Sequence, residues 1–416
     1  MNGMMVSEFA AGAGIHLGMA GADRGKAEAR GVISMKTFVR IGVVTVLALS
    51  VLAGPVLAQA KPLTEEELAQ GWIQLFDGET LFGWTQLGAG NWRVEEGNIV
   101  VDGWSNGWIA TTSAFTNCEL VVKLRVSPEG GASVSVQPHL EKNAHELDAN
   151  AVAVVARTEK DQKPEWRTVR IVLEKDSAKM SIDDKSPANI PVLSTPRYVG
   201  IQTFGKGTTL EISEVKLRPL GLESIFNGKD LTGWNIIPDH KSVFSVVDGA
   251  MRIENGNGQI ETDAVYKDFV LQLDVVAYGN SNPEKKPLNS GVFFRSPKGV
   301  FWKGYESQLR NEWTDDDRTK PHDFGTGGIY ALQPTRKVIP NEGDWFHKTI
   351  VVHGNHMATW VNGYQTADYT DVRPPVTNGD GKAGLVMEPG TITLQGHDPT
   401  TKLDFKNINI SAYPEK

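Results

Sequence analysis

The chain has 416 residues, a formal net charge of −8 at pH 7, 22% charged residues and 40% hydrophobic residues. This length suffices for two or three domains with large cores, and the negative charge argues against a nucleic-acid-binding protein, which needs a basic face for phosphate. Glycine (43 residues) and tryptophan (11 residues) are plentiful and long helical periodicity is scarce, which favours short strands joined by turns.

The N-terminal part has the pattern of a targeting segment. Lys36 and Arg40 precede an apolar run over 41–57, which ends in the small-residue motif Ala-Gln-Ala at 58–60. This pattern predicts a secretory signal peptide over 35–60 and therefore an exported protein, periplasmic or extracellular, with no membrane association after cleavage. A retained anchor helix is the alternative.

Residues 1–34 precede this segment and are interpreted as a mis-extended or disordered leader. The fold is expected to begin after residue 60. Thr64 and Glu67 have the spacing of a capping box and Gly71 is a typical helix stop. One short helix is therefore predicted here.

The remaining chain contains one unit twice. The phrase LFDGETLFGW ends at Trp84 and IFNGKDLTGW ends at Trp234, and further matching segments follow in the same order in both halves. Each shared segment alternates apolar and polar residues over a strand length and stops at Gly, Asn or Asp. The sequence therefore predicts an all-β protein of two tandem two-sheet sandwiches, over 61–219 and 220–416.

The joint between the sandwiches, at 218–221, is too short for a flexible linker, so we expect the two to pack together. Phe76 and Phe226 of the repeated phrase are expected in the cores, and its tryptophans at the sandwich edges. The single cysteine, Cys118, excludes intrachain disulfides and lies in an alternating strand pattern. We expect it to be a buried small hydrophobe, with a reactive thiol as the alternative.

The second copy carries polar residues that the first copy lacks. Arg295 corresponds to Gln137, and His397 corresponds to Phe204. An insertion of about 25 residues, longer than a hairpin loop requires, also occurs only in the second copy. We therefore expect the chemistry in the second copy.

Within the insertion, YESQLR alternates as a strand, so Glu306, Gln308 and Arg310 point to one side. Together with Arg295 on a neighbouring strand they are expected to form a convergent polar cluster on the concave face, and an exposed hairpin face is the alternative. The glycines of TGGIY suit a bulge or a close approach to a ligand, so Tyr330 is expected to wall the pocket.

The signals for metal ions are weak. The histidines of this half lack a helical spacing and a cysteine partner, so no zinc site is predicted; they include His322, His347, His353 and His356. The aspartates at 315–317 suit a calcium ion or, as the alternative, a solvated loop. No cofactor is required, and a divalent metal such as calcium stays open.

The second copy resembles the 3-keto-disaccharide hydrolase domain family over nearly all of 222–412. The resemblance rests on the opening phrase and on NSGVFFRSP, YESQ, TGGIY, GDWF, WVNG and LQGHD. The first copy resembles a degenerate member that keeps the opening phrase and lacks the middle motifs. The resemblance implies a concanavalin- or laminin-G-like jelly roll that acts on oxidised sugars.

Two positions depart from the family's usual pattern. Asn311 stands where an acidic residue commonly follows the YE.Q strand, and Glu312 comes directly after it. The order GHD at 396–398 replaces the commoner DHG, which moves the histidine, His397, by one residue.

A 3-keto sugar permits an elimination mechanism, because the C3 carbonyl makes the C2 proton removable and the C1 glycosidic oxygen can then leave. Water adds afterwards, which completes a net hydrolysis. Such a site needs a base, a donor or cation for the enolate and an acid for the leaving oxygen. We predict Glu306 as the base and His397 as the proton donor. The predicted substrate-binding residues are Arg295, Gln308, Asn311, Tyr330 and Trp302.

Two other functions fit the same sequence. A non-catalytic carbohydrate-binding protein is one, because sandwich folds serve lectins as well as enzymes. A conventional glycoside hydrolase is the other, and it would need a second essential carboxylate. The expected partner is in each case a sugar, as an oligosaccharide or a 3-keto-glycoside, and a homo-oligomer stays open.

Overall fold

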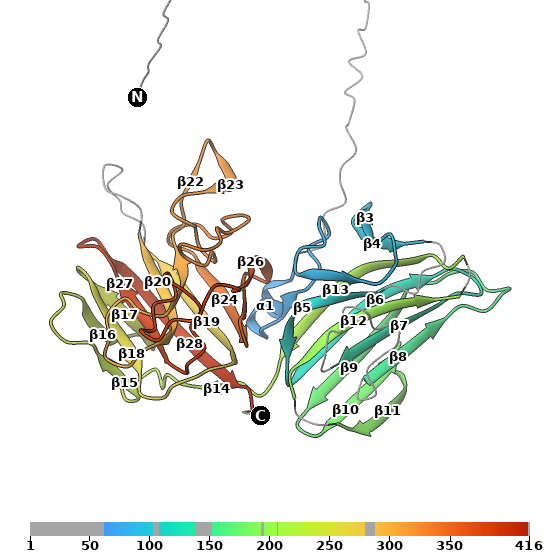
Figure 1. The fold of residues 1–416 in the computed structure, drawn as a ribbon, viewed down its shortest axis with the longest axis horizontal. Helices are drawn as coiled ribbons and strands as arrows, with labels where there is room; N and C mark the ends of the chain where they lie inside the picture. The colour runs from blue at the N-terminus through green and yellow to red at the C-terminus, as the bar shows by residue number, and fades with distance from the viewer. Residues whose placement is uncertain are drawn as a thin grey trace, which may run out of the picture. The chain divides into compact units, whose positions relative to one another are not determined.

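Figure 1 shows the computed structural model, which describes residues 62–102, 108–137, 152–192, 195–205, 207–278 and 288–414. The predicted leader (1–34) and signal peptide (35–60) lie outside the described residues. Within the described ranges, no helix is both long and apolar enough to cross a membrane.

The described chain opens with the short helix α1 (Glu65–Ala69). The Thr64 hydroxyl accepts the Glu67 backbone N–H at 3.2 Å, and the Glu67 carboxylate accepts the Thr64 backbone N–H at 2.8 Å. Gly71 follows the helix with a positive φ of 85°. The predicted capping box and helix stop are both confirmed.

The first sandwich consists of two antiparallel sheets (Figure 1). The large sheet contains, in spatial order, β11 (Lys185–Pro191), β10 (Ser177–Ile182), β9 (Arg167–Glu174), β6 (Cys118–Val126), β13 (Leu210–Pro219), β4 (Asn98–Val101) and β3 (Arg93–Glu95), with β1 (Ile73–Gln74) also paired to β13. The small sheet contains β2 (Trp84–Leu87), β5 (Trp108–Phe115), β12 (Arg197–Phe204), β7 (Gly131–Gln137) and β8 (Val152–Arg157).

The second sandwich repeats this arrangement. Its large sheet contains β16 (Val243–Val247), β17 (Ala250–Glu254), β28 (Lys402–Ala412), β19 (Phe269–Ala277), β24 (Trp345–His353), β25 (His356–Val361) and β26 (Tyr364–Thr370), with β14 (Glu223–Ser224) paired to β28. Its small sheet contains β15 (Trp234–Ile236), β18 (Gly258–Thr262), β27 (Thr391–Gly396), β20 (Ser290–Ser296) and β21 (Tyr305–Leu309). A separate hairpin pairs β22 (Trp313–Thr314) with β23 (Asp317–Pro321).

The strands of the two sandwiches correspond one to one. In each, the spatial order of the small sheet is first, second, fifth, third and fourth along the chain, and the terminal strand of the copy crosses the middle of the large sheet. The prediction of an all-β protein with two tandem jelly-roll sandwiches is therefore confirmed. The β22–β23 hairpin belongs to the insertion and has no counterpart in the first copy.

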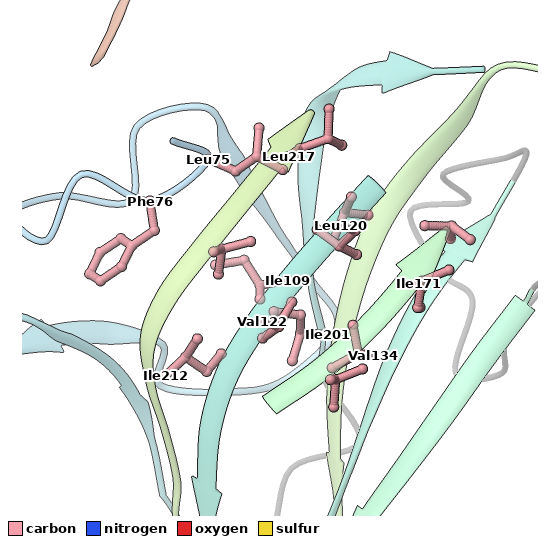
Figure 2. Packing of buried hydrophobic residues seen from close by; sticks show 14 of the residues in the cluster. Leu75, Phe76, Ile109, Leu120, Val122, Val134, Ile171, Ile201, Ile212 and Leu217 are labelled. Atoms are coloured by element: carbon pink, nitrogen blue, oxygen red, sulfur yellow. The ribbon is translucent and has the colours of Figure 1, made fainter. Parts of the chain in front are cut away.

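The core of the first sandwich lies between its two sheets. Figure 2 shows Ile109, Val134 and Ile201 of the small sheet packed with residues of the large sheet, among them Leu120 and Ile171. These side chains alternate along their strands with residues on the opposite face, which is the period-two pattern of the sequence. Their burial supplies the main driving force for closing the two sheets on each other.

The repeated phrase has the same structural role in both copies. Phe76 and Phe226 are buried, as predicted. The Trp84 indole N–H donates to the Leu75 carbonyl at 2.5 Å, and the Trp234 indole N–H donates to the Ile225 carbonyl at 2.7 Å. Both tryptophans begin edge strands. Each indole hydrogen bond links the edge strand to the segment that precedes it in the chain, as expected for edge anchors.

The two sandwiches share buried contacts. Trp360, on the outer face of the second large sheet, belongs to the first sandwich's hydrophobic cluster and donates its indole N–H to the Gln74 carbonyl at 2.9 Å. The Tyr413 hydroxyl donates to the Ala114 carbonyl at 2.7 Å. Cys118 is buried in the same cluster, and burial raises the pKa of its thiol to about 12, so it is the inert residue that was predicted.

Candidate functional site

The outer face of the second small sheet is lined by polar side chains, which we call the polar face. Core residues such as Tyr305 and Leu309 of β21 point between the sheets, so the alternate residues point outward. Apart from Phe293 and Gly291, the outward residues of β18, β27, β20 and β21 are polar and almost fully buried: Gln259, Glu261, Glu306, Gln308, Thr391, Thr393 and Gln395. A buried polar face of this size is unusual, because buried polar groups require partners.

Strand pairing brings the members of the polar face together. Phe293 of β20 lies opposite Glu306 on one side and Thr393 on the other, and Gly291 lies opposite Gln308. Gln259 of β18 lies opposite Gln395 of β27. Strand β20 therefore separates the strand of Glu306 from the strand that leads to His397.

Glu306 is the most perturbed carboxyl group of the polar face. Only 6% of the residue is exposed. Its pKa is raised to about 8, chiefly because burial disfavours the charged form, while the Lys382 ammonium lowers the pKa and the Asp323 carboxylate raises it. Lys382 Nζ lies 4.0 Å from Glu306 Oε2.

Gly291 provides the space for this carboxyl group. A Cβ at position 291 would lie 2.6 Å from Glu306 Cγ and would overlap its carboxylate. The absent side chain on β20 therefore lets Glu306 lean across the sheet instead of pointing away from it.

Gln308 lies next to Glu306 on the same face. Its Nε2 donates to the Asp323 carbonyl at 2.9 Å, while its Oε1 is buried and has no protein hydrogen-bond donor in the described chain. The Asp323 carboxylate also receives the Asn289 amide at 3.3 Å and the Arg310 guanidinium at 3.4 Å. Among the described residues, Gln308 thus places a buried acceptor atom without a protein donor beside Glu306.

Tyr330 lies at the edge of the polar face, beside Glu306. Residues 326–330 extend the sheet beyond β21, and the Tyr330 backbone N–H donates to the Glu306 carbonyl at 2.9 Å. Lys382 Nζ lies 4.5 Å from the centre of the tyrosine ring. A Cβ at Gly327 would collide with the Thr366 side chain, and one at Gly328 would collide with the Phe324 carbonyl. Packing within the protein therefore explains the glycines of TGGIY, without a ligand.

Trp302 and His397 lie on the other side of the polar face. Their rings are stacked, with centroids 5.7 Å apart, and 40% of Trp302 is exposed. The Trp302 backbone N–H donates to Gln259 Oε1 at 2.8 Å, which ties its loop to the polar face. His397 Nδ1 pairs with Asp398 Oδ1 at 3.0 Å. The structure therefore brings His397, Trp302, Glu306 and Gln308 to one face.

Arg295 does not join this cluster, which corrects the expectation of a convergent group that includes it. A register shift between β20 and β27 and a positive φ of 52° turn its side chain away from the row of Phe293 and Glu306. The guanidinium is fully buried and donates to Asp268 and to three backbone carbonyls, those of Lys267, Val386 and Gly354. These contacts assign Arg295 a structural role.

Asn311 also differs from the expectation. Its Oδ1 accepts the Thr326 hydroxyl at 2.5 Å and its Nδ2 donates to the Asn341 carbonyl at 3.4 Å, so both ends of the amide are engaged by the protein. The neighbouring Glu312 forms a two-contact ion pair with Arg310. Neither residue is available as a free ligand group.

Asp315 and Asp316 lie in the turn between β22 and β23, and Asp317 begins β23. Lys320 pairs with Asp315 at 3.1 Å. In the described part of the chain, no group of three or more His, Cys, Asp or Glu side chains is arranged to hold a metal ion.

Three residues near Glu306 or Gln308 were not identified from the sequence: Lys382, Asp323 and Lys348. Lys348 is fully buried, which lowers its pKa to about 7, and it donates to the Gln308 carbonyl at 3.3 Å from the core side. A lysine inside an apolar strand, as in FHKTIVV, is a local signal that could have identified it. Lys382 and Asp323 lie in loops without periodicity and carry no such signal.

The corresponding face of the first sandwich lacks these groups. Phe293 lies opposite Glu306, whereas its counterpart Ser135 lies opposite Ala153. The next residue of β8 on that face, Val155, is aliphatic. The two sandwiches therefore share a framework but not a carboxyl group at this position.

A family model, that of the 3-keto-α-glucoside-1,2-lyase-like domain, matches residues 71–218 and again 221–411. The chain belongs to this family. Membership in the 3-keto-α-glucoside-1,2-lyase-like family, in two tandem copies, supports a sugar-processing role for the protein. A search of curated proteins found no match.

The solved structures to which the chain is similar include two candidate glycosyl hydrolases from Parabacteroides distasonis. One is 21% identical with a TM-score of 0.37 and covers 47% of this chain and 94% of its own; the other is 22% identical with a TM-score of 0.37 and covers 46% and 99%. A carbohydrate-binding module from Bacillus subtilis is 15% identical with a TM-score of 0.31 and covers 43% of this chain and 96% of its own.

Proposed function

We propose that the protein is an exported enzyme that cleaves 3-keto-glycosides by elimination followed by hydration. The observation that carries the proposal is Glu306, a buried carboxyl group with a pKa raised to about 8, placed 4.0 Å from a lysine ammonium. A base whose pKa lies near the working pH is effective in abstracting a carbon-bound proton. Export rests on the signal-peptide pattern over 35–60.

In the first step, Glu306 removes the proton from C2 of the keto sugar, and the electron pair delocalises onto the C3 oxygen as an enolate. The Lys382 ammonium, next to Glu306, is the cation that stabilises this oxygen. The enolate then re-forms the C3 carbonyl, the C1–C2 double bond forms and the C1–O bond breaks. His397 supplies the proton to the departing oxygen.

In the second step, water adds across the C1–C2 double bond. Oxygen bonds to C1, C2 regains a proton from Glu306, and the proton released by the water passes to His397. The sum of both steps is hydrolysis, and both Glu306 and His397 return to their starting protonation states. The exposed part of Trp302 offers an apolar surface to a sugar ring, and Gln308 Oε1 is an acceptor for a sugar hydroxyl.

The test compares Glu306→Gln with wild type on a 3-keto-α-glucoside and on the unoxidised sugar, with sugar release as the readout. We expect a loss of about 10²–10⁴-fold in kcat, because one positioned proton-transfer group contributes this much. Glu254→Gln is the matched control, since Glu254 pairs with Lys402 at 3.6 Å on the large sheet. Full activity in Glu306→Gln would refute the assignment.

The unoxidised sugar separates the alternatives. The Asp323 carboxylate lies 3.4 Å from Nε2 of Gln308, the neighbour of Glu306 on the polar face, and is the candidate second carboxylate of a conventional glycoside hydrolase. Cleavage of the unoxidised sugar that is lost in Asp323→Asn would favour that function. Binding of either sugar without release would favour a carbohydrate-binding protein.

A further inference from the structure

The insertion of the second sandwich contains a segment that leads from the site to the first sandwich. We call residues 326–338 the Tyr330 segment. At one end it pairs with β21, where the Tyr330 N–H meets the Glu306 carbonyl. At the other end it reaches β26, where the Asp368 N–H donates to Gln333 Oε1 at 2.8 Å and the Arg336 N–H donates to the Thr366 carbonyl at 3.0 Å.

Arg336 of this segment contacts the repeated phrase of the first sandwich. Its guanidinium donates to Asp77 Oδ2 at 2.8 Å and to the Thr80 hydroxyl at 2.9 Å. It also lies 4.2 Å from the ring centre of Phe82. The side chains of Arg336 and Asp77 are 19% and 6% exposed, so this ion pair is largely shielded from solvent. Shielded pairs are worth more than exposed ones when one partner is removed.

A second contact between the sandwiches involves Asp368, whose backbone N–H donates to Gln333 of the Tyr330 segment. Asp368 Oδ2 accepts the Thr112 hydroxyl of β5 at 2.5 Å and the Gln365 amide at 2.9 Å. The Thr112 backbone N–H in turn donates to the Gly83 carbonyl at 3.0 Å. The first sandwich therefore meets the Tyr330 segment directly through Asp77 and indirectly through Thr112.

The two copies of the repeated phrase differ at the residue that makes this contact. Asn227 stands in the second copy where Asp77 stands in the first. Asn227 Oδ1 accepts the Lys229 and Asp230 N–H groups, and Asp77 Oδ1 accepts the equivalent N–H groups of Glu79 and Thr80. The turn itself needs only this shared set of bonds. The charged Oδ2 of Asp77 is the additional feature: it accepts the Thr80 hydroxyl within the turn at 2.7 Å and the Arg336 guanidinium at 2.8 Å.

We propose that the first sandwich is a support for the active site of the second, and that Asp77 is its positioning residue. By holding Arg336, Asp77 keeps the Tyr330 segment against β21, and the segment keeps Tyr330 beside Glu306 and Lys382. The reference to catalysis rests on the proposed function. The proposal that Asp77 orders residues 326–338 is independent of the proposed function.

The experiment uses the full chain with Asp77→Asn, which retains the turn acceptor and removes the charge. Hydrogen–deuterium exchange is followed for peptides that cover 326–338, together with kcat and KM on the 3-keto-α-glucoside. We expect roughly tenfold faster exchange in this segment, because its local opening loses one anchor, and a lower kcat with little change in melting temperature. Asp77→Glu, which keeps the charge, is expected to restore protection.

Glu211→Gln is the matched control, since it removes the same charge from an ion pair within the first sandwich, with Arg125. Unchanged exchange over 326–338 in Asp77→Asn, or equal acceleration in the control, would overturn the inference. Absence of turnover in wild type would instead refute the proposed function, and the exchange result would still decide the role of Asp77.

Discussion

At the scale of single residues, the ionisation of Glu306 is set by opposing neighbours. Burial and Asp323 raise its pKa to about 8, and Lys382 lowers it. A base must be deprotonated to act, so the fraction of active enzyme increases as the pH rises through this pKa. Lys382 therefore has two roles. Its positive charge favours the ionised form of the base, and it stabilises the negative charge of the enolate.

This balance predicts the pH dependence of the reaction. A 3-keto-glycoside whose leaving group departs as a stable anion, such as 4-nitrophenolate, needs no proton from His397. With this substrate, kcat/KM of wild type is expected to rise with pH and to level off above about 8, because free Glu306 is then ionised. In Lys382→Met the rising limb should move to higher pH, since the cation that favours the carboxylate is gone, and the plateau should be lower. The measurement is kcat/KM between about pH 6 and pH 10. The role of Glu306 as base would be contradicted if kcat/KM decreased as the pH rises through 8. It would also be contradicted if Lys382→Met left the rising limb at the same pH.

At the scale of elements, the pairing of β20 with β21 and β27 creates the site. Gly291 is the member of β20 that makes room for Glu306, and its backbone lacks the positive φ that would demand glycine. Its importance is therefore spatial. An alanine can adopt the strand conformation, but its methyl group would occupy the position of the carboxyl group.

We expect Gly291→Ala to fold with nearly unchanged stability and to lose about 10-fold or more in kcat/KM, because a displacement of about 1 Å in a catalytic group has effects of this size. The double variant Gly291→Ala/Glu306→Gln provides the control: in the absence of the carboxylate, the alanine should cause little further loss. Equal losses from Gly291→Ala in both backgrounds, or a large fall in melting temperature, would show that Gly291 acts through the fold.

At the scale of the whole molecule, the two sandwiches meet around a buried histidine. His356 Nε2 lies 3.2 Å from the Ser113 hydroxyl of β5, and its Nδ1 lies 2.9 Å from the Thr370 hydroxyl of β26. Burial lowers the pKa of His356, and the Asp368 carboxylate, 3.6 Å away, opposes this effect. The neutral imidazole is thus favoured in the folded protein.

The sign of this shift predicts acid sensitivity. A histidine with a pKa lowered below the ordinary value of 6.5 stabilises the fold at higher pH, and this contribution is lost as the pH falls through the folded-state pKa. The melting temperature of wild type should therefore fall more than that of His356→Gln between about pH 7.5 and pH 5. Differential scanning calorimetry measures both, and an equal fall in the two proteins would contradict the prediction.

The sequence by itself determined the features that depend on local periodicity. Alternation with period two revealed the strands, and repetition of one phrase revealed two sandwiches, because each copy must build the same edge and core. The same alternation placed Glu306 and Gln308 on one face. These relations involve neighbours within a strand, whose directions are set by the extended backbone.

The tertiary structure alone decided which groups meet across the sheet. Lys382 and Asp323 reach Glu306 from loops, where no period relates sequence to direction, and the register shift near Arg295 reverses what alternation predicts for that side chain. The Asn311 amide oxygen accepts a hydrogen bond from Thr326, whose position depends on the path of the insertion. The contact of Asp77 with Arg336 joins residues of different sandwiches. These contacts depend on tertiary packing, which the local periodicity of the sequence does not encode.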